Sequence, residues 1–142
     1  MPIWIKIIFF TLNSLLIFTT FAYEDVKISK VISVYDGDTI RINIDSFPDI
    51  IGKNIRVRLK GIDAPEIKGK CQKEIDLAVM ARDYLRNAIN KSNQIELRNI
   101  ERGKYFRIVG ELYINGENIS SDLIKSKLAY YYNGGKKRSW CH

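Results

Sequence analysis

The chain has 142 residues, of which 23 are Lys or Arg and 16 are Asp or Glu, so its formal net charge is +7. This length suits one domain with one hydrophobic core, and the positive charge favours polyanionic partners such as nucleic acid or an anionic envelope. The single histidine is His142, the last residue, which argues against a histidine acid–base mechanism and against a histidine-ligated zinc site.

The first 22 residues have the pattern of a secretory signal peptide. Lys6 is the one charged residue there, an apolar stretch follows it, and small residues flank Phe21 before the expected cleavage near Ala22. The expected mature domain, residues 23–142, is then secreted or periplasmic and has no stable membrane insertion. The alternative is an uncleaved anchor, but the apolar stretch is shorter than the ~20 residues that a membrane span needs.

The first half of the mature domain reads as strands. A run of β-branched residues over 26–34 leads to the turn dipeptide Asp36-Gly37. Clean alternation over 39–44 and again over 55–59 predicts two further strands, each with one apolar face. A loop over 45–53, with a proline and a glycine, joins them.

The second half changes period. Apolar residues recur at three- and four-residue steps over 74–89, as on one face of a helix. Strands are expected from Ile95 onward and over 107–114, and the second of these ends at the hairpin dipeptide Asn115-Gly116.

A short helix over 122–128, capped by Ser120 or Ser121, precedes the tail. The order of elements predicts a mainly β, α+β domain: a five-stranded OB-fold barrel with a helix between strands 3 and 4 and a short C-terminal helix. From the order of elements alone, other small α+β barrels remain alternatives.

The two cysteines, Cys71 and Cys141, allow one intramolecular disulfide. In an exported protein this bridge would fasten the C-terminal tail and stabilise the fold by about 4 kcal/mol. The alternative is two separate thiols; no C-x-x-C or metal-finger spacing is present.

A set of charged residues stands where loops at one end of a small barrel converge. Taken one at a time, such residues are more often turn residues, solvated loop residues or surface charges. Taken together they are the candidate site: Asp38, Arg58, Asp63, Glu66 and Arg107.

Three segments carry a resemblance to a known family. VYDGDTI, RVRLKGIDAPE and KYFRIVGELYINGENI resemble, in order and spacing, the motifs of the staphylococcal nuclease family, from about Val31 to about Tyr132. The resemblance implies a five-stranded OB barrel that cleaves DNA and RNA phosphodiesters with calcium. It also implies attack of water on phosphorus and products that carry a 3′-phosphate.

The resemblance implies a calcium site made by Asp38, Asp63 and the main-chain carbonyl of Ala64. The family member compared has threonine at the third position, but alanine keeps the carbonyl. Calcium accepts 6–8 oxygen ligands in loose geometry, so these groups with substrate oxygens and water suffice.

The resemblance likewise implies the catalytic residues. Glu66 holds or activates the attacking water, and Arg58 and Arg107 grip the scissile phosphate. The loop before Arg107 departs from the family pattern, as at Gly103, and Arg102 is the substitute if the register slips.

Further candidates for substrate binding are Lys104, Tyr130 and Tyr132. The tyrosines offer a stacking surface for a base, or alternatively pack at the end of the preceding helix. The basic run 136–138 either contacts phosphates or is simply solvated. The family's third helix is missing here, and a Cys71–Cys141 bridge could replace it as a clamp.

The sequence therefore predicts an exported, monomeric, calcium-dependent nuclease with DNA and RNA as substrates and little sequence preference. One alternative is a non-catalytic nucleic-acid-binding OB-fold module. Another, supported only by export and charge, is an envelope-binding structural protein.

Overall fold

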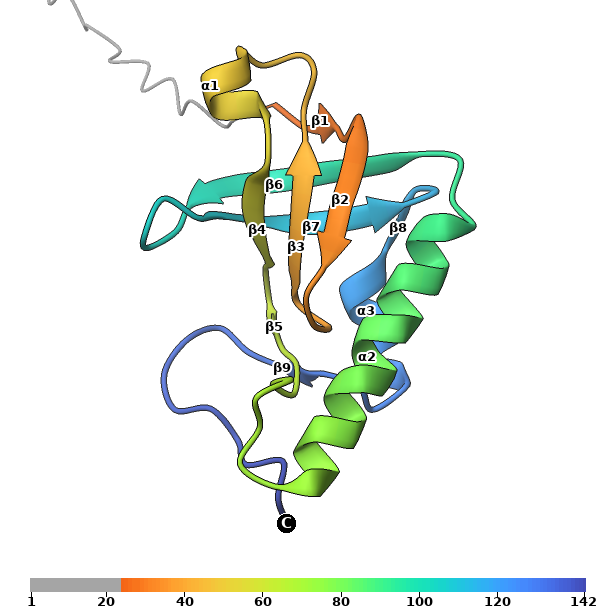
Figure 1. Ribbon diagram of the computed structural model, residues 1–142, viewed down its shortest axis with the longest axis vertical. Helices are drawn as coiled ribbons and strands as arrows, with labels where there is room; N and C mark the ends of the chain where they lie inside the picture. Colours follow the sequence, from red (N-terminus) through yellow and green to blue (C-terminus); the bar gives the residue numbers. More distant parts are fainter. Residues whose placement is uncertain (1–23) are drawn as a thin grey trace, which may run out of the picture.

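The computed structural model describes residues 24–142, so the expected signal peptide and its cleavage position lie outside the described residues. One large sheet, ordered β1-β6-β7-β4-β3-β2 with β8 paired to β7, curls into a half-barrel (Figure 1). Its strands are β1 (Val26–Lys27), β2 (Lys30–Val34), β3 (Thr39–Asn43), β4 (Ile55–Leu59), β6 (Ile95–Arg102), β7 (Ile108–Ile114) and β8 (Glu117–Asn118).

Two short strands and three helices complete the fold. They are β5 (Ile62–Asp63), β9 (Tyr130–Tyr131), α1 (Asp49–Gly52), α2 (Gln72–Asn90) and α3 (Ile119–Lys125). The five long strands are β2, β3, β4, β6 and β7, and α2 lies between the third and the fourth. Neighbouring strands are antiparallel except β4 and β7, which are parallel. The predicted OB-type arrangement is thereby confirmed.

The alternating residues of β3 build the core. Ile40, Ile42 and, just past the strand, Ile44 have no exposed surface, because a strand sends every second side chain to the same face. Thr39 and Arg41 take the opposite face and lie partly exposed. This opposite face of the sheet is therefore free to carry polar groups.

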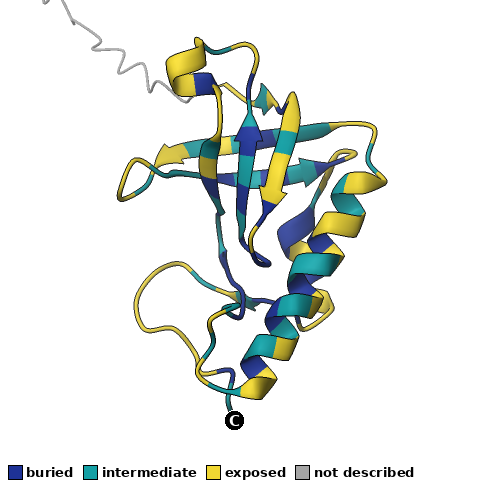
Figure 2. Ribbon diagram, in the orientation of Figure 1, coloured by how far each residue is buried: buried dark blue, intermediate teal, exposed yellow. Residues whose placement is uncertain are grey.

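Helix α2 closes one side of the half-barrel. Ala78, Ala81 and Leu85 are fully buried at steps of three and four residues, so one stripe of the helix faces the sheet (Figure 2). Leu123 of α3 joins the same core. Burying such a leucine contributes roughly 1.5–3 kcal/mol.

The structure differs from the predicted elements in several places, of which three bear on the fold. The run over 26–34 forms two strands, β1 and β2, and a register shift between Val31 and Ser33 accompanies a 44% exposed Ile32. The predicted 45–53 loop contains the short helix α1. Helix α3 begins earlier than expected because the side chain of Asn118 accepts a hydrogen bond from the amide of Ser120 at 3.0 Å.

The C-terminal tail folds back onto the loop that precedes α2. Strand β9 pairs with β5, with Asp63 opposite Tyr130. The Trp140 ring, nearly buried, then stacks on Tyr130 with centroids 4.0 Å apart. Within the described part of the chain, no helix combines the length and apolar character needed to cross a bilayer.

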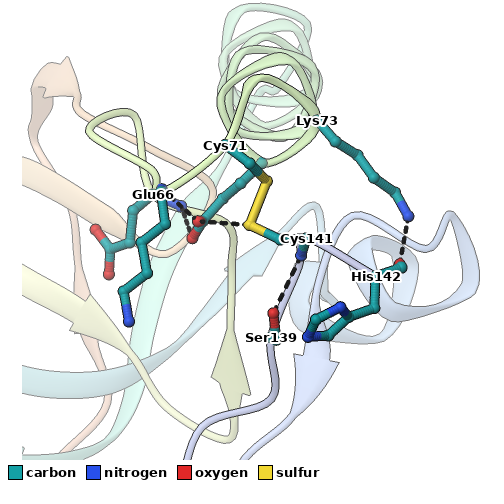
Figure 3. Close-up of a disulfide and its surroundings, with 8 residues drawn as sticks. Glu66, Cys71, Lys73, Ser139, Cys141 and His142 are labelled. Carbon is teal, nitrogen blue, oxygen red and sulfur yellow. Dashed lines mark hydrogen bonds between the residues drawn. A yellow bond between two sulfur atoms is a disulfide. The ribbon is translucent and has the colours of Figure 1, made fainter.

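A disulfide fixes the end of this tail. Cys71, immediately before α2, is bonded to Cys141, and their Cα atoms are 5.9 Å apart across a sequence separation of 70 (Figure 3). The bridge ties the last residues of the chain to the start of the main helix.

Candidate functional site

The candidate site forms where the β2–β3 turn meets the loop that follows β4. Gly37 makes this approach possible, because a Cβ atom there would lie 2.7 Å from Ala81 Cβ and 2.9 Å from Ala64 Cβ. Asp38 then bonds both the end of β4 and the segment that follows it. Its carbonyl accepts from the Leu59 amide, and its carboxylate accepts from the Ala64 amide, both at 2.8 Å.

Arg58 lies between two buried aspartates. One of its amino nitrogens donates to Asp38 Oδ1, and the other lies 3.3 Å from Asp63 Oδ1. The second nitrogen also donates to the Ile62 carbonyl at 3.1 Å. The Arg58 side chain is 14% exposed, and the two carboxylates are 1% and 4% exposed. These three predicted site residues thus meet in one nearly dry cluster.

A third buried carboxylate adds negative charge. Asp36 accepts a hydrogen bond from the Asp38 amide at 3.1 Å. Burial, helped by the charge of Asp38, raises the pKa of Asp36 to about 7. Burial also raises the pKa of Asp38, against the opposing effect of Arg58.

These carboxylates fit a hard divalent cation. Asp36, Asp38 and Asp63 are all buried, with Asp36 bonded to the Asp38 amide and Arg58 between Asp38 and Asp63, and burial disfavours ionisation of Asp36 and Asp38 in the absence of further positive charge. A cation would supply that charge, and carboxylate and carbonyl oxygens are the ligands that calcium takes. Ala64, whose carbonyl is the third expected ligand, is 2% exposed and held against Asp38.

Glu66 lies at the solvent-exposed edge of the carboxylate cluster. Its side chain is 47% exposed, so water reaches the carboxylate. Pro65, beside it, is fully buried, which anchors the loop. Buried Glu74 on α2 also accepts from the Lys70 amide at 2.8 Å and from the Glu66 amide at 3.4 Å. The loop thus holds Asp63 inward and Glu66 outward.

Arg107 lines the same cleft as Arg58 and Glu66, a hollow of about 880 Å³. Among residues 24–142, its Nε is a buried donor without a hydrogen-bond partner, which is an unusual state for a buried polar atom. Arg102, the substitute considered for it, is exposed beside Phe106 and is not among the cleft residues. The placement therefore favours Arg107.

Of the three residues expected to bind substrate, one lines the cleft and two do not. Tyr132 lines the cleft, and its hydroxyl donates to the Gly135 carbonyl at 2.9 Å. Tyr130 packs against Trp140 instead, and Lys104 is exposed in the β6–β7 loop; neither is among the residues that line the cleft. The structure thus joins Tyr132, but not these two, to the other site residues.

Two residues at the site carried no predicted site role. Asp36 lay within the VYDGDTI motif, so the motif could have indicated it. The sequence predicts for Lys137 only a phosphate contact shared with the whole run 136–138, not a contact with the site carboxylates, yet its ammonium lies 2.7 Å from Asp63 Oδ1 and 3.3 Å from Glu66 Oε1. Partial burial is the largest single influence and lowers the pKa of Lys137, but the hydrogen bond to Asp63, the charge of Asp63 and the hydrogen bond to Glu66 together outweigh it, so the pKa is raised.

Comparisons with known proteins indicate the family of the chain. The chain is 31% identical over 90 residues to an uncharacterized 38.1 kDa protein of Capnoides sempervirens, covering 63% of this chain and 25% of the relative. It is 31% identical over 91 residues to staphylococcal-like nuclease CAN1 of Arabidopsis thaliana, covering 64% and 26%. It is 30% identical over 104 residues to an uncharacterized endonuclease of Escherichia coli, covering 72% and 60%.

The chain thus spans about a quarter of the two plant relatives and 60% of the bacterial one. Residues 56–139 match the family described as staphylococcal nuclease homologue, a range that contains Arg58, Asp63, Glu66 and Arg107. The match covers more than half of the chain and most of the described domain. The protein belongs to the staphylococcal nuclease homologue family.

Proposed function

We propose that this protein is an exported, calcium-dependent nuclease that hydrolyses phosphodiester bonds of DNA and RNA with little sequence preference. The observation that carries the proposal is the cluster in which Arg58 bridges two buried aspartates, beside a cleft that also holds Glu66 and Arg107. Family membership supports the nuclease assignment. The relative named staphylococcal-like nuclease and the one named endonuclease point the same way.

The divalent ion would be held by Asp38, Asp63 and the Ala64 carbonyl, and when bound it supplies positive charge that polarises the scissile phosphate. Arg58 and Arg107 would hold the non-bridging phosphate oxygens with fixed guanidinium donors. Because negative charge grows on these oxygens in the transition state, each donor is expected to lower the barrier by about 3 kcal/mol.

Glu66 would accept a proton from the attacking water, since its carboxylate is exposed to solvent and faces the cleft. The water oxygen forms a new bond to phosphorus while the bond to the 5′-oxygen breaks, which leaves a 3′-phosphate on one product. The 5′-oxygen then takes up a proton from solvent.

The wider cleft suits a polyanion without sequence preference. Four additional arginines line it beyond the catalytic pair, and they can contact phosphates of any sequence. They lie on the outer face of the sheet and on α2: Arg41, Arg56, Arg82 and Arg86.

The test is digestion of a fluorescent single-stranded DNA and of the matching RNA, with calcium or with chelator. We expect digestion with calcium only, and a loss of about 100-fold or more for Glu66→Gln and for Arg58→Ala. Glu117→Gln, an exposed carboxylate on β8 outside the cleft, is the matched control. Binding without digestion in every divalent metal would contradict the proposal and favour the non-catalytic binding module.

Export is supported by the apolar N-terminal segment and by the disulfide, since disulfides persist in oxidising compartments. Fractionation of bacteria that express the full chain, followed by N-terminal sequencing, tests it. We expect a product outside the cytoplasm that begins near Tyr23. An unprocessed cytoplasmic product would contradict export without affecting the nuclease proposal.

A further inference from the structure

The last ten residues form a strap, residues 133–142, that crosses the edge of the site before returning to α2. Its far end is fixed twice, by the Cys71–Cys141 disulfide and by the stacking of Trp140 on Tyr130. Its near end continues from β9, which pairs with β5 beside Asp63. The strap is therefore held at both ends, and its middle can reach only the groups that it passes.

Lys137 is the residue of this strap that enters the site. Its ammonium lies 2.7 Å from Asp63 Oδ1 and 3.3 Å from Glu66 Oε1, and its side chain lines the cleft. The adjacent Lys136 is exposed and does not line the cleft. Arg138 lies over the Tyr130 ring at 5.3 Å. One of three consecutive cations is thus singled out by geometry.

The ammonium bonds the same Asp63 oxygen that contacts Arg58, in the cluster proposed to hold the divalent ion. Calcium takes its oxygen ligands at 2.3–2.6 Å, so an ion on Asp63 and an ammonium on the same carboxylate would repel each other at close range. The same ammonium also forms an ion pair with the carboxylate of Glu66, the residue proposed to accept a proton from the attacking water.

We propose that Lys137 is a tethered counter-ion that competes with the divalent cation for Asp63 and Glu66. It neutralises these carboxylates when no metal is bound and must leave them when the metal binds, so it lowers the affinity for the metal. The inference rests on the proposed metal site and adds a competitor that the chain itself supplies.

The test is isothermal titration calorimetry of the disulfide-bonded protein with calcium alone, without nucleic acid. We expect Lys137→Gln to lower the dissociation constant for calcium by at least about fivefold, because a competing charge is removed. Lys136→Gln is the matched control: it removes the same charge from the neighbouring residue, and solvent screening should keep its effect below about twofold.

The disulfide that fixes the end of the strap allows a second test. Removing the disulfide, by Cys71→Ser with Cys141→Ser, should also tighten calcium binding, since only the stacking of Trp140 on Tyr130 then holds the far end of the strap and Lys137 leaves the carboxylates more easily. Circular dichroism would check that this double variant is folded. If it is not, Lys137→Gln still tests the proposal, because the Lys137 side chain is half-exposed and its replacement should not unfold the protein.

The outcomes separate the two proposals. Equal calcium affinity of Lys137→Gln and Lys136→Gln, or weaker binding by Lys137→Gln than by the unmodified protein, overturns the competition alone. Absence of calcium binding by every variant overturns the metal site and the competition with it. Tighter binding by Lys137→Gln alone among the two lysine variants supports both.

Discussion

Removal of the Cys71–Cys141 disulfide should strongly destabilise the folded protein. The bridge closes a loop with a sequence separation of 70. In the chain-entropy description, closing a loop of this length reduces the entropy of the unfolded chain by about 15 cal/mol/K, which corresponds to about 4 kcal/mol at 25 °C. The expected loss of unfolding free energy for Cys71→Ala with Cys141→Ala is therefore about 4 kcal/mol, a large part of the 5–15 kcal/mol typical of a domain.

Urea unfolding followed by tryptophan fluorescence measures this loss, since Trp140 lies in the fastened tail and is 5% exposed. Circular dichroism serves as a second probe of the whole domain. Reducing agent is the internal control: it should lower the stability of the unmodified protein to that of the double variant, and leave the double variant unchanged. A loss below about 1 kcal/mol would refute the view that the bridge restricts the unfolded chain.

Three further predictions concern the site. Gly37→Ala should lower the unfolding free energy by about 1–3 kcal/mol, because the new methyl group would meet Ala81 and Ala64 at less than 3 Å; thermal melting measures it, and an unchanged midpoint would contradict the close approach. In chelator, the pKa of Asp36 is raised from 3.8 to about 7 in the folded state, so the folded protein binds that proton more tightly. The resulting stability is complete below pH 3.8 and is lost as the pH rises through about 7. Asp36→Asn should remove this decline, whose slope is at most about 1.4 kcal/mol per pH unit, and parallel stability curves for the two proteins would argue against it. Arg107→Lys keeps the charge but loses the planar fork, so kcat should fall about 100-fold; a fall of less than threefold would exclude a bidentate role.

The core could be predicted from the sequence because its signal is local. The alternation that buries Ile40, Ile42 and Ile44, and the helical repeat that buries Ala81 and Leu85, are visible within a few residues. The start of α3 was misplaced because Asn118 competes as a cap with the serines that follow it. Helix α1 is a single turn, too short for a periodic pattern to reveal.

Part of the candidate site could be predicted because its sequence signal is also local. Asp63 and Glu66 lie in one motif, and their spacing from Arg58 carried the prediction. The role of Lys137 could not be read in this way, because its contact with Glu66 spans 71 residues and depends on the paired strands and the disulfide that place the strap. Tyr130 is of a residue type that can stack on a base, but its ring already stacks on the ring of Trp140. No local sequence pattern reveals this contact.

A crystal structure with calcium and a non-hydrolysable dinucleotide tests the central claim most directly. The account predicts one calcium ion 2.3–2.6 Å from oxygens of both Asp38 and Asp63, and a phosphate group within hydrogen-bonding distance of both Arg58 and Arg107. An ion bound away from these aspartates, or a phosphate that only one of the two guanidinium groups can reach, would contradict it.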